Sequence, residues 1–231
     1  MIIPIFAYET HEKHENQERK FYFYDFFIPF VYFAGKISWV IIRYMKTVGE
    51  FVQEAVDFMN SGAYRQAVLP CALAIDATAQ KVFGKENLSE DDFKGFLKEN
   101  WQLISFMGMA RALPLPMNIP FGLKRIMPSF NVHHGADEII LLVLRETMKF
   151  GKMPEEFTFN SEGKFEIKDD KLLIPRGLVN GLLGSVIFHT VNKDETIGEK
   201  YWMSISDFKM FISELWGRQD LADRIMKFYL E

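Results

Sequence analysis

The sequence predicts a mainly α-helical fold, an antiparallel helical bundle that carries a small β-hairpin insert. Three observations support this class. Apolar residues recur at helical spacing over most of the chain after residue 45. Two of the expected helices are joined by a very short link at Gly62, which makes them antiparallel neighbours. Only the stretch near residue 160 alternates apolar and polar residues around a turn sequence, as a β-hairpin does.

The composition is that of a globular protein. The chain has 231 residues, of which 48% are hydrophobic and 25% are charged, enough to bury one core. The net charge is −4 and the isoelectric point is about 5.8, so overall charge does not indicate binding to RNA or to an acidic membrane. The single cysteine, Cys71, lies in an apolar run, which favours a buried thiol and a reducing, cytoplasmic compartment.

Residues 1–44 differ in composition from the rest of the chain. Nine of the thirteen residues in FYFYDFFIPFVYF, residues 21–33, are aromatic. Asp25, Lys36 and the proline between them interrupt the ~20 apolar residues that a membrane-spanning helix needs, so we expect no membrane contact. The segment is either an aromatic arm that packs on the domain or on a second copy, or an over-long start that precedes the true first residue, Met45. The composition change favours the second interpretation, so we expect the domain to cover residues 45–231 and the extension to be dispensable.

The first two helices are expected between residues 48 and 84. The first one stops at Gly62, and the second restarts at once with a strip of small residues that permits close helix contact. Pro70 should kink or locally break the second helix. This hairpin is similar to one tetratricopeptide unit, but no second copy follows at a fixed period. The apolar face of the first helix comprises Val48, Phe51, Val52, Ala55 and Met59.

A third helix is expected from Ser89, a good N-cap that three acidic residues follow, to Gly108. Three prolines between Pro114 and Pro120 make the next segment irregular. The stretch ADEIILLVLRETMKFG, residues 136–151, fits a helix or, in its central part, a buried strand. The acidic residues at its start favour a helix.

The clearest hairpin signal is EFTFNSEGKFEIK, residues 156–168, which alternates apolar and polar residues around NSEG. The segment after it, IPRGLVNGLLGSVIFHTVN, is expected to be a helix with Pro175 in its first turn. Another helix is expected to begin at Ser204 or Ser206, and QDLADRIMKFYLE closes the chain as the last one.

Three glycines, Gly177, Gly181 and Gly184, lie on one face of the helix that follows the hairpin. Their sequence, GLVNGLLG, matches neither the dinucleotide-binding fingerprint nor the phosphate-binding P-loop. Each glycine costs a helix about 1 kcal/mol relative to alanine. We therefore expect a compensating contact, in which the backbone of a neighbouring helix approaches this face.

The segment FNVHHG, residues 130–135, contains the only adjacent histidines of the chain. A metal site needs three or more converging ligands, and no histidine or cysteine spacing in the chain supplies them, so no metal or cofactor is expected. A histidine can transfer a proton near neutral pH, and an arginine can hold a phosphodiester. Together with a polar residue they are enough to promote attack of an RNA 2′-hydroxyl on its own phosphate.

Asp76 is a further candidate, because it lies among small apolar residues in ALAIDATAQKVFG. One interpretation places it on an exposed helix face. The other makes it a half-buried carboxylate with a basic partner, for which Arg125 is a candidate.

Two stretches together resemble a known family. AVDFMNSGAYRQAVLPCALAIDATAQKVFG, residues 55–84, is similar to the first helical hairpin of the HEPN superfamily (higher eukaryotes and prokaryotes nucleotide-binding). SFNVHHGA, residues 129–136, stands where that family has an R-N-x-x-x-H segment, and His134–Gly135 matches the end of the pattern. The motif is degenerate, because Ser129 stands five positions before His134 and the nearest upstream arginine is Arg125.

The resemblance implies a dimeric helical bundle whose active members cleave RNA without a metal ion, and whose other members act as interaction domains. We expect a cytosolic interaction domain, non-catalytic or weakly catalytic, in a homodimer or with another protein partner, in a bacterial defence or stress system. One alternative is a metal-independent endoribonuclease that uses His134, Arg125 and Asn131. Asp76 and His133 are the expected binding residues. A second alternative is a tetratricopeptide-like scaffold that binds peptides along the first hairpin.

Overall fold

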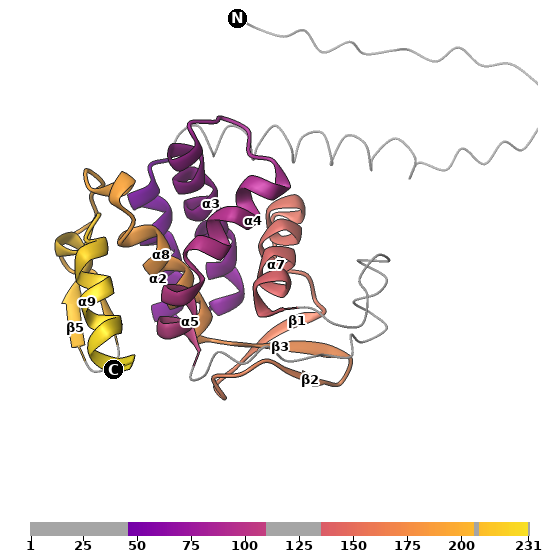
Figure 1. Cartoon of the computed structure of the whole chain (residues 1–231). Coiled ribbons are helices and arrows are strands. Elements are labelled where there is room, and N and C mark those ends of the chain that lie inside the picture. The colour runs from indigo at the N-terminus through magenta and orange to yellow at the C-terminus, as the bar shows by residue number, and fades with distance from the viewer. Residues whose placement is uncertain (1–45, 110–134, 206–207, 231) are drawn as a thin grey trace, which may run out of the picture. The chain divides into compact units, whose positions relative to one another are not determined.

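The computed structural model describes residues 46–109, 135–205 and 208–230. These residues belong to one compact unit of the chain, Trp39–Glu231, while the other unit, Met1–Ser38, lies outside the described ranges, as does the expected extension before Met45. In the described ranges the chain is mainly helical, with a few short strands in two small sheets (Figure 1). The predicted fold class is therefore confirmed at this level.

The first described helix, α2 (Val48–Asn60), begins with a capping box. The Thr47 hydroxyl accepts a hydrogen bond from the Glu50 backbone N–H at 3.1 Å, and the Glu50 carboxylate accepts one from the Thr47 N–H at 2.7 Å. The apolar face that spacing predicted is buried, except that Met59 is partly exposed. A left-handed Gly62, at φ 77°, turns the chain into the next helix.

The second helix, α3 (Tyr64–Phe83), packs against α2, α4, α7 and α8 and forms the centre of the described structure (Figure 1). It continues through Pro70, so the predicted local break does not occur. The small residues Ala67, Cys71 and Ala74 are fully buried, which confirms that this strip is a helix-packing surface.

The predicted third helix is two helices, α4 (Glu90–Glu99) and α5 (Trp101–Gly108). Ser89 caps α4 as expected, in a capping box with Asp92. Asn100 lies between the helices, and both its backbone N–H and its side-chain amide donate to the Phe96 carbonyl, at 3.2 and 2.9 Å. After the undescribed residues, α7 (Ala136–Phe150) forms the predicted helix and ends at the left-handed Gly151.

A three-stranded sheet follows α7, with β1 (Phe157–Asn160), β2 (Glu166–Lys168) and β3 (Lys171–Pro175). The order is β1-β3-β2, in which β1 is parallel and β2 antiparallel to β3. The predicted hairpin across NSEG is therefore wrong, because β3 lies between the two strands that were expected to pair.

The hairpin of this sheet joins β2 to β3 through Asp169 and Asp170. Both residues are left-handed, with φ of 51° and 57°, as the central residues of a type I′ turn require. Asn160 organises the NSEG loop instead, since its side chain accepts from the Glu162 N–H and donates to the Lys164 carbonyl, each at 3.0 Å.

Helix α8 (Gly177–Ile187) does not include Pro175, which was expected in its first turn and is instead the last residue of β3. Its glycine face packs against α5. A Cβ added to Gly177 would lie 2.6 Å from the Gly108 carbonyl oxygen, and one added to Gly181 would overlap the Ile104 carbonyl oxygen. The expected close backbone contact is confirmed.

The C-terminal region contains a two-stranded antiparallel sheet, β4 (Trp202–Ile205) and β5 (Phe208–Phe211), in place of the helix expected from Ser204 or Ser206. Met203 and Met210 are partners across this sheet and pack toward the core. The alternation of inward and outward side chains along a strand therefore outweighed the helical spacing of the apolar residues. Short 3-10 helices follow α8 and β5, at η1 (Thr190–Asn192) and η2 (Ile212–Glu214).

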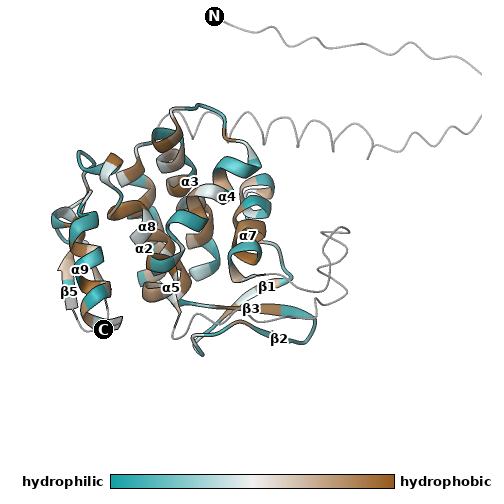
Figure 2. Cartoon of the chain, in the orientation of Figure 1, coloured by the Kyte–Doolittle hydropathy of each residue, from teal (hydrophilic) through white to brown (hydrophobic). Residues whose placement is uncertain are grey.

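The last helix is α9 (Gln219–Leu230). In Figure 2 hydrophobic residues colour long stretches of α3, α7 and α8, whereas α9 alternates between hydrophilic and hydrophobic residues. Helices α3, α7 and α8 supply much of the core, and α9 has an apolar and a polar side.

The contact between α5 and α8 makes Gly181 intolerant of a side chain. We expect Gly181→Ala to destabilise the protein by about 1–3 kcal/mol, and Gly181→Leu by more, because the new atoms meet backbone. Gly95→Ala is the matched control on α4, where an added Cβ meets only the Phe83 ring at 3.8 Å. That change should be neutral or stabilise by up to about 1 kcal/mol. Urea unfolding of both variants measures the difference, and equal stabilities would contradict the packing.

Candidate functional site

Four of the five expected site residues, Arg125, Asn131, His133 and His134, lie in the stretch 110–134, outside the described residues. The described residues begin again at Gly135, the N-cap of α7. The expected arrangement of a histidine, an arginine and an asparagine therefore remains a prediction.

Asp76 is described, and it is buried in α3 with 8% of its surface exposed. The interpretation that placed it on an exposed helix face is therefore wrong. The Gln80 side-chain amide, one turn further along α3, donates to the Asp76 carboxylate at 3.0 Å. A buried carboxylate needs such donors, because burial without them costs several kcal/mol. Its expected partner Arg125 lies outside the described residues.

A second polar cluster joins α3 to the segment after α8. Asn192 is fully buried, and its amide donates to the Thr78 hydroxyl and to the Val186 carbonyl, both at 2.9 Å. Its side-chain oxygen accepts from Lys81 Nζ at 3.1 Å. Lys81 also pairs with Glu195 at 2.6 Å, and Glu195 accepts the Gly49 N–H in the first turn of α2 at 2.9 Å. These bonds tie α2, α3 and η1 together, and sequence spacing contained no signal for them.

His189 lies at the end of α8, half-buried, with its ring stacked on Phe96 at a centroid distance of 5.6 Å. Its Nδ1 accepts a hydrogen bond from the Val191 N–H at 3.4 Å and caps η1. Burial lowers the pKa of His189, and the nearby Glu99 carboxylate offsets part of this effect. The lowered pKa favours the neutral form of this side chain near neutral pH.

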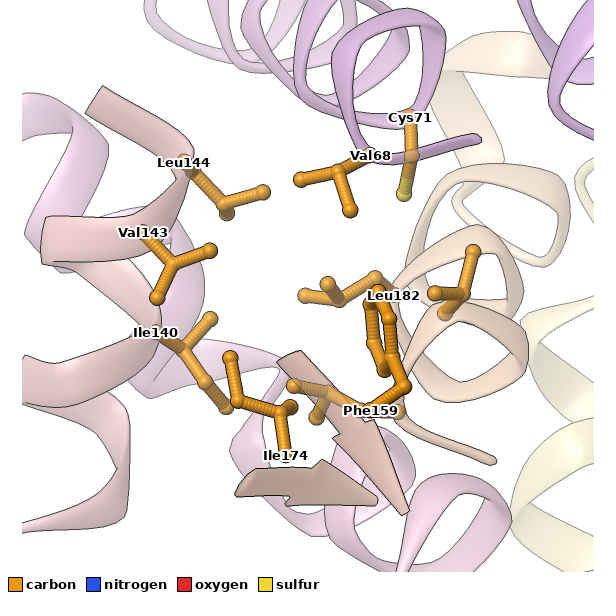
Figure 3. A pocket seen from close by; sticks show the side chains of 10 residues that line it. Val68, Cys71, Ile140, Val143, Leu144, Phe159, Ile174 and Leu182 are labelled. Atoms are coloured by element: carbon orange, nitrogen blue, oxygen red, sulfur yellow. The ribbon is translucent and has the colours of Figure 1, made fainter. Parts of the chain in front are cut away.

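A small apolar cavity lies between α3, α7, α8 and the first sheet (Figure 3). Its free volume is about 10 Å³, about enough for one water molecule. Burial raises the pKa of the Cys71 thiol, which faces this space, well above its usual value and keeps the thiol protonated. The cavity is a packing defect, too small for a ligand. Its lining residues are Val68, Cys71, Ile140, Val143, Leu144, Phe159, Ile174, Leu178, Val179 and Leu182.

The surface of α9 has an apolar stripe, which we define as Leu221, Ile225 and Phe228. Their spacing of four and three residues puts them on one side of the helix. A neighbouring face, about 100° around the helix, holds Ala222 and Met226, which are buried. Phe228 is 75% exposed, so the apolar sector of α9 extends beyond the part that the described residues cover.

The β4–β5 sheet carries an exposed aromatic pair on one face. Trp202 and Phe211 are cross-strand partners and are 43% and 50% exposed. Lys209 Nζ lies 3.6 Å from the centre of the Trp202 ring, a cation–π contact. Large exposed aromatic side chains of this kind often anchor protein–protein interfaces.

Within residues 46–109, 135–205 and 208–230 there is no group of three or more histidine, cysteine, aspartate or glutamate residues that could hold a metal ion. In the same ranges no helix has the length and apolar character to span a membrane.

Comparisons with known proteins identify the family. The profile of the Rv1289 family matches residues 47–230, which is 184 of the 231 residues, so the chain belongs to this family. Similar proteins include the uncharacterized proteins Rv1289 of Mycobacterium tuberculosis (strain ATCC 25618 / H37Rv) and Mb1320 of Mycobacterium bovis. Each is 25% identical over 189 residues, covering 75% of this chain and 85% of the relative. No solved structure matches the chain.

The burial of Asp76 predicts a stability cost when its carboxylate is removed. We expect Asp76→Ala to lower the free energy of unfolding by about 1–3 kcal/mol, because the partly buried Gln80 amide loses its hydrogen-bond acceptor. Glu162→Ala, which removes an exposed carboxylate, should change it by less than about 0.5 kcal/mol. Chemical denaturation measures both, and a neutral Asp76→Ala would mean that the carboxylate is not held in a polar contact.

His189 predicts a pH dependence of stability. Its pKa is lowered in the folded state, so between the folded pKa and the unfolded pKa of about 6.5 the unfolded chain binds this proton more tightly than the folded chain. The stability contributed by neutral His189 is therefore present above about pH 6.5 and is lost as the pH falls through the folded pKa. His189→Asn keeps a side-chain acceptor for the η1 cap and does not titrate. We expect wild type to lose more stability than this variant between about pH 7 and 5. Parallel stability curves would contradict the prediction.

Proposed function

We propose that this member of the Rv1289 family is a cytoplasmic helical interaction domain that binds a protein partner through its C-terminal surfaces and has no, or only weak, catalytic activity. The distribution of exposed aromatic side chains carries the proposal. In the described part of the chain seven large hydrophobic side chains are exposed, and four of them, all aromatic, lie between positions 202 and 230. They are Trp202, Phe211, Phe228 and Tyr229.

Two features make these side chains suitable for binding. Trp202 and Phe211 are held in register on a paired sheet, which fixes their backbone positions side by side before any partner binds. Phe228 extends an apolar stripe on a helix whose neighbouring face is buried at Ala222 and Met226, and the Tyr229 ring beside it lies 6.0 Å from the Phe106 ring of α5. A rigid aromatic surface of this type is typical of the residues that dominate binding energy in interfaces.

The α2–α3 hairpin, and the position of α7 directly after His134 and Gly135, support a HEPN-like arrangement of the domain. By analogy with that superfamily we propose a homodimer and a role in a bacterial defence or stress system. The tetratricopeptide-like scaffold has less support, because α3 is packed against α2, α4, α7 and α8 and offers little free surface to a peptide.

A metal-independent endoribonuclease is the second candidate function. The observation that favours it is the sequence VHHG at the start of α7, with His134 next to the N-cap residue. In this mechanism His134 would act as general acid or base, Arg125 would hold the phosphate, and Asn131 would orient it.

The interaction function predicts contacts in the cell. A photo-crosslinking amino acid placed at Trp202 or at Phe228 should form discrete protein adducts in living cells. The same amino acid at Phe150, a phenylalanine of α7 that is 53% exposed, is the matched control and should form few. Adducts at all three positions, or at none, would remove the support for a C-terminal binding surface.

The ribonuclease candidate is tested with single-stranded RNA in the presence of a chelator. We expect the wild-type chain to leave the RNA intact between about pH 6 and 8, because the motif lacks its arginine at Ser129. Chelator-resistant cleavage that leaves a cyclic phosphate, and that His134→Ala reduces by about 100-fold, would instead establish the enzyme. His133→Ala should matter less in that case.

A further inference from the structure

We propose that α9 is a hinged strap, which opens as one unit about Gly217 while the rest of the described structure stays folded. The closed position is the one in Figure 1, where α9 contacts α5. Opening separates α9 from α5 and uncovers apolar surface around Phe106. The inference goes beyond the proposed function, because it concerns a movement of the chain and does not depend on any partner.

Much less burial holds α9 in place than holds the helices around it. Among the described side chains of α9, two are buried, Ala222 at 2% and Met226 at 6% exposed. In α8, a helix of similar length, nine of the eleven residues are buried. Burial of apolar side chains is the main favourable term that holds a helix on a domain. Helix α9 should therefore leave its place at a much smaller cost in free energy than α8.

The polar side chains at the start of α9 bond to one another. Asp220 pairs with Arg218 at 3.0 Å and with Arg224 at 2.9 Å, and the Gln219 amide donates to the Asp223 carboxylate at 3.5 Å. Both partners of each bond lie within residues 218–224, so they move together when α9 moves. These five side chains therefore do not resist the opening of the helix.

The residues before α9 have the arrangement of a hinge. Leu215 and Trp216 are 0% and 6% exposed, so they stay with the core. Gly217 follows them in the left-handed region, at φ 70°, where glycine meets no steric penalty. Its N–H donates to the Ile187 carbonyl at 2.9 Å, which ties this point of the chain to the end of α8. Hinges absorb a movement in a few backbone angles at such a boundary between anchored and free chain.

The geometry of α9 favours opening as a whole. Ala222 and Met226 are four residues apart and lie on one side of the helix, so release of one removes the support of the other. A helix of twelve residues is marginal in water without tertiary packing. The ring contact of Tyr229 with Phe106, at 6.0 Å, is lost in the same movement.

Thiol labelling of the full chain tests the hinge, because the single cysteine lies in the centre of the fold. Cys71 is fully buried in α3 and reports unfolding of the whole domain. Ala222→Cys places a second thiol on the buried side of α9. We expect this thiol to react about 100-fold faster than Cys71 in the same molecule, or more. Urea should accelerate Cys71 steeply and position 222 only slightly, since opening α9 exposes less surface.

The matched control is Ala79→Cys, the same change at a fully buried position of α3. Its new thiol should react as slowly as Cys71. Equal rates at position 222 and at Cys71 would overturn the inference, because α9 would then leave its place only when the domain unfolds.

Amide exchange of the wild-type chain gives a second reading that needs no substitution. The hydrogen-bonded amides of α9 should share one protection factor, about 100-fold or more below those of α3. Protection equal to that of α3 would contradict the movement. A gradient along α9, lowest in its last turn, would also contradict it, since the helix would then unravel from one end instead of turning about Gly217.

Discussion

The close approach of α5 and α8 is the contact on which the surrounding structure depends. With glycine at positions 108, 177 and 181, the two backbones meet without side chains between them. The end of α8 then holds the C-terminal region, because the Ile187 carbonyl accepts the Gly217 N–H at 2.9 Å. Helix α5 holds α9 through the ring contact of Phe106 with Tyr229. The glycine contact thus sets the position of the surface that we propose to bind a partner.

Polar groups inside the described structure serve a different purpose from those at its surface. The buried side chains of Asn192 and Thr78 bond to each other between η1 and α3, and Asn192 also accepts from the exposed Lys81. Lys81 pairs with the partly buried Glu195, which satisfies an N–H at the start of α2. Arg65 does the same for the loop before β1, since its guanidinium donates to the carbonyls of Met153, Pro154 and Phe157. A buried group that is bonded in this way costs little free energy, whereas an orphaned one costs about 1–3 kcal/mol. These residues therefore act as cross-links of the fold.

Patterns that depend on neighbours in the chain predicted the structure well, and patterns that depend on distant segments did not. Capping residues and helical spacing identified α2, α3, α4 and α7, and the glycine strip predicted the α8 contact. The pairing of β1 with β3 could not be predicted, because NSEG is a stronger turn signal than the two aspartates that form the turn. The segment of β5 was predicted as a helix from its local sequence. It forms a strand because its pairing with β4 outweighs that local preference. The sequence left Asp76 either exposed or half-buried. The packing of other elements around α3 buries it, and local sequence does not reveal that packing.

The two faces of α9 have different energetic roles. Ala222 and Met226 are 2% and 6% exposed, so their burial already contributes to folding. Phe228 contributes little in the same sense, because three quarters of its surface remains in water. Burying a phenylalanine completely stabilises a complex by about 1.5–3 kcal/mol, and the partly exposed Leu221 and Ile225 would add to that. A helix anchored on one side can offer this free energy to a partner without giving up its own place in the fold. The same argument holds for Trp202 and Phe211. The register of β4 and β5 fixes the location of these residues, so the half-exposed rings remain available to a partner.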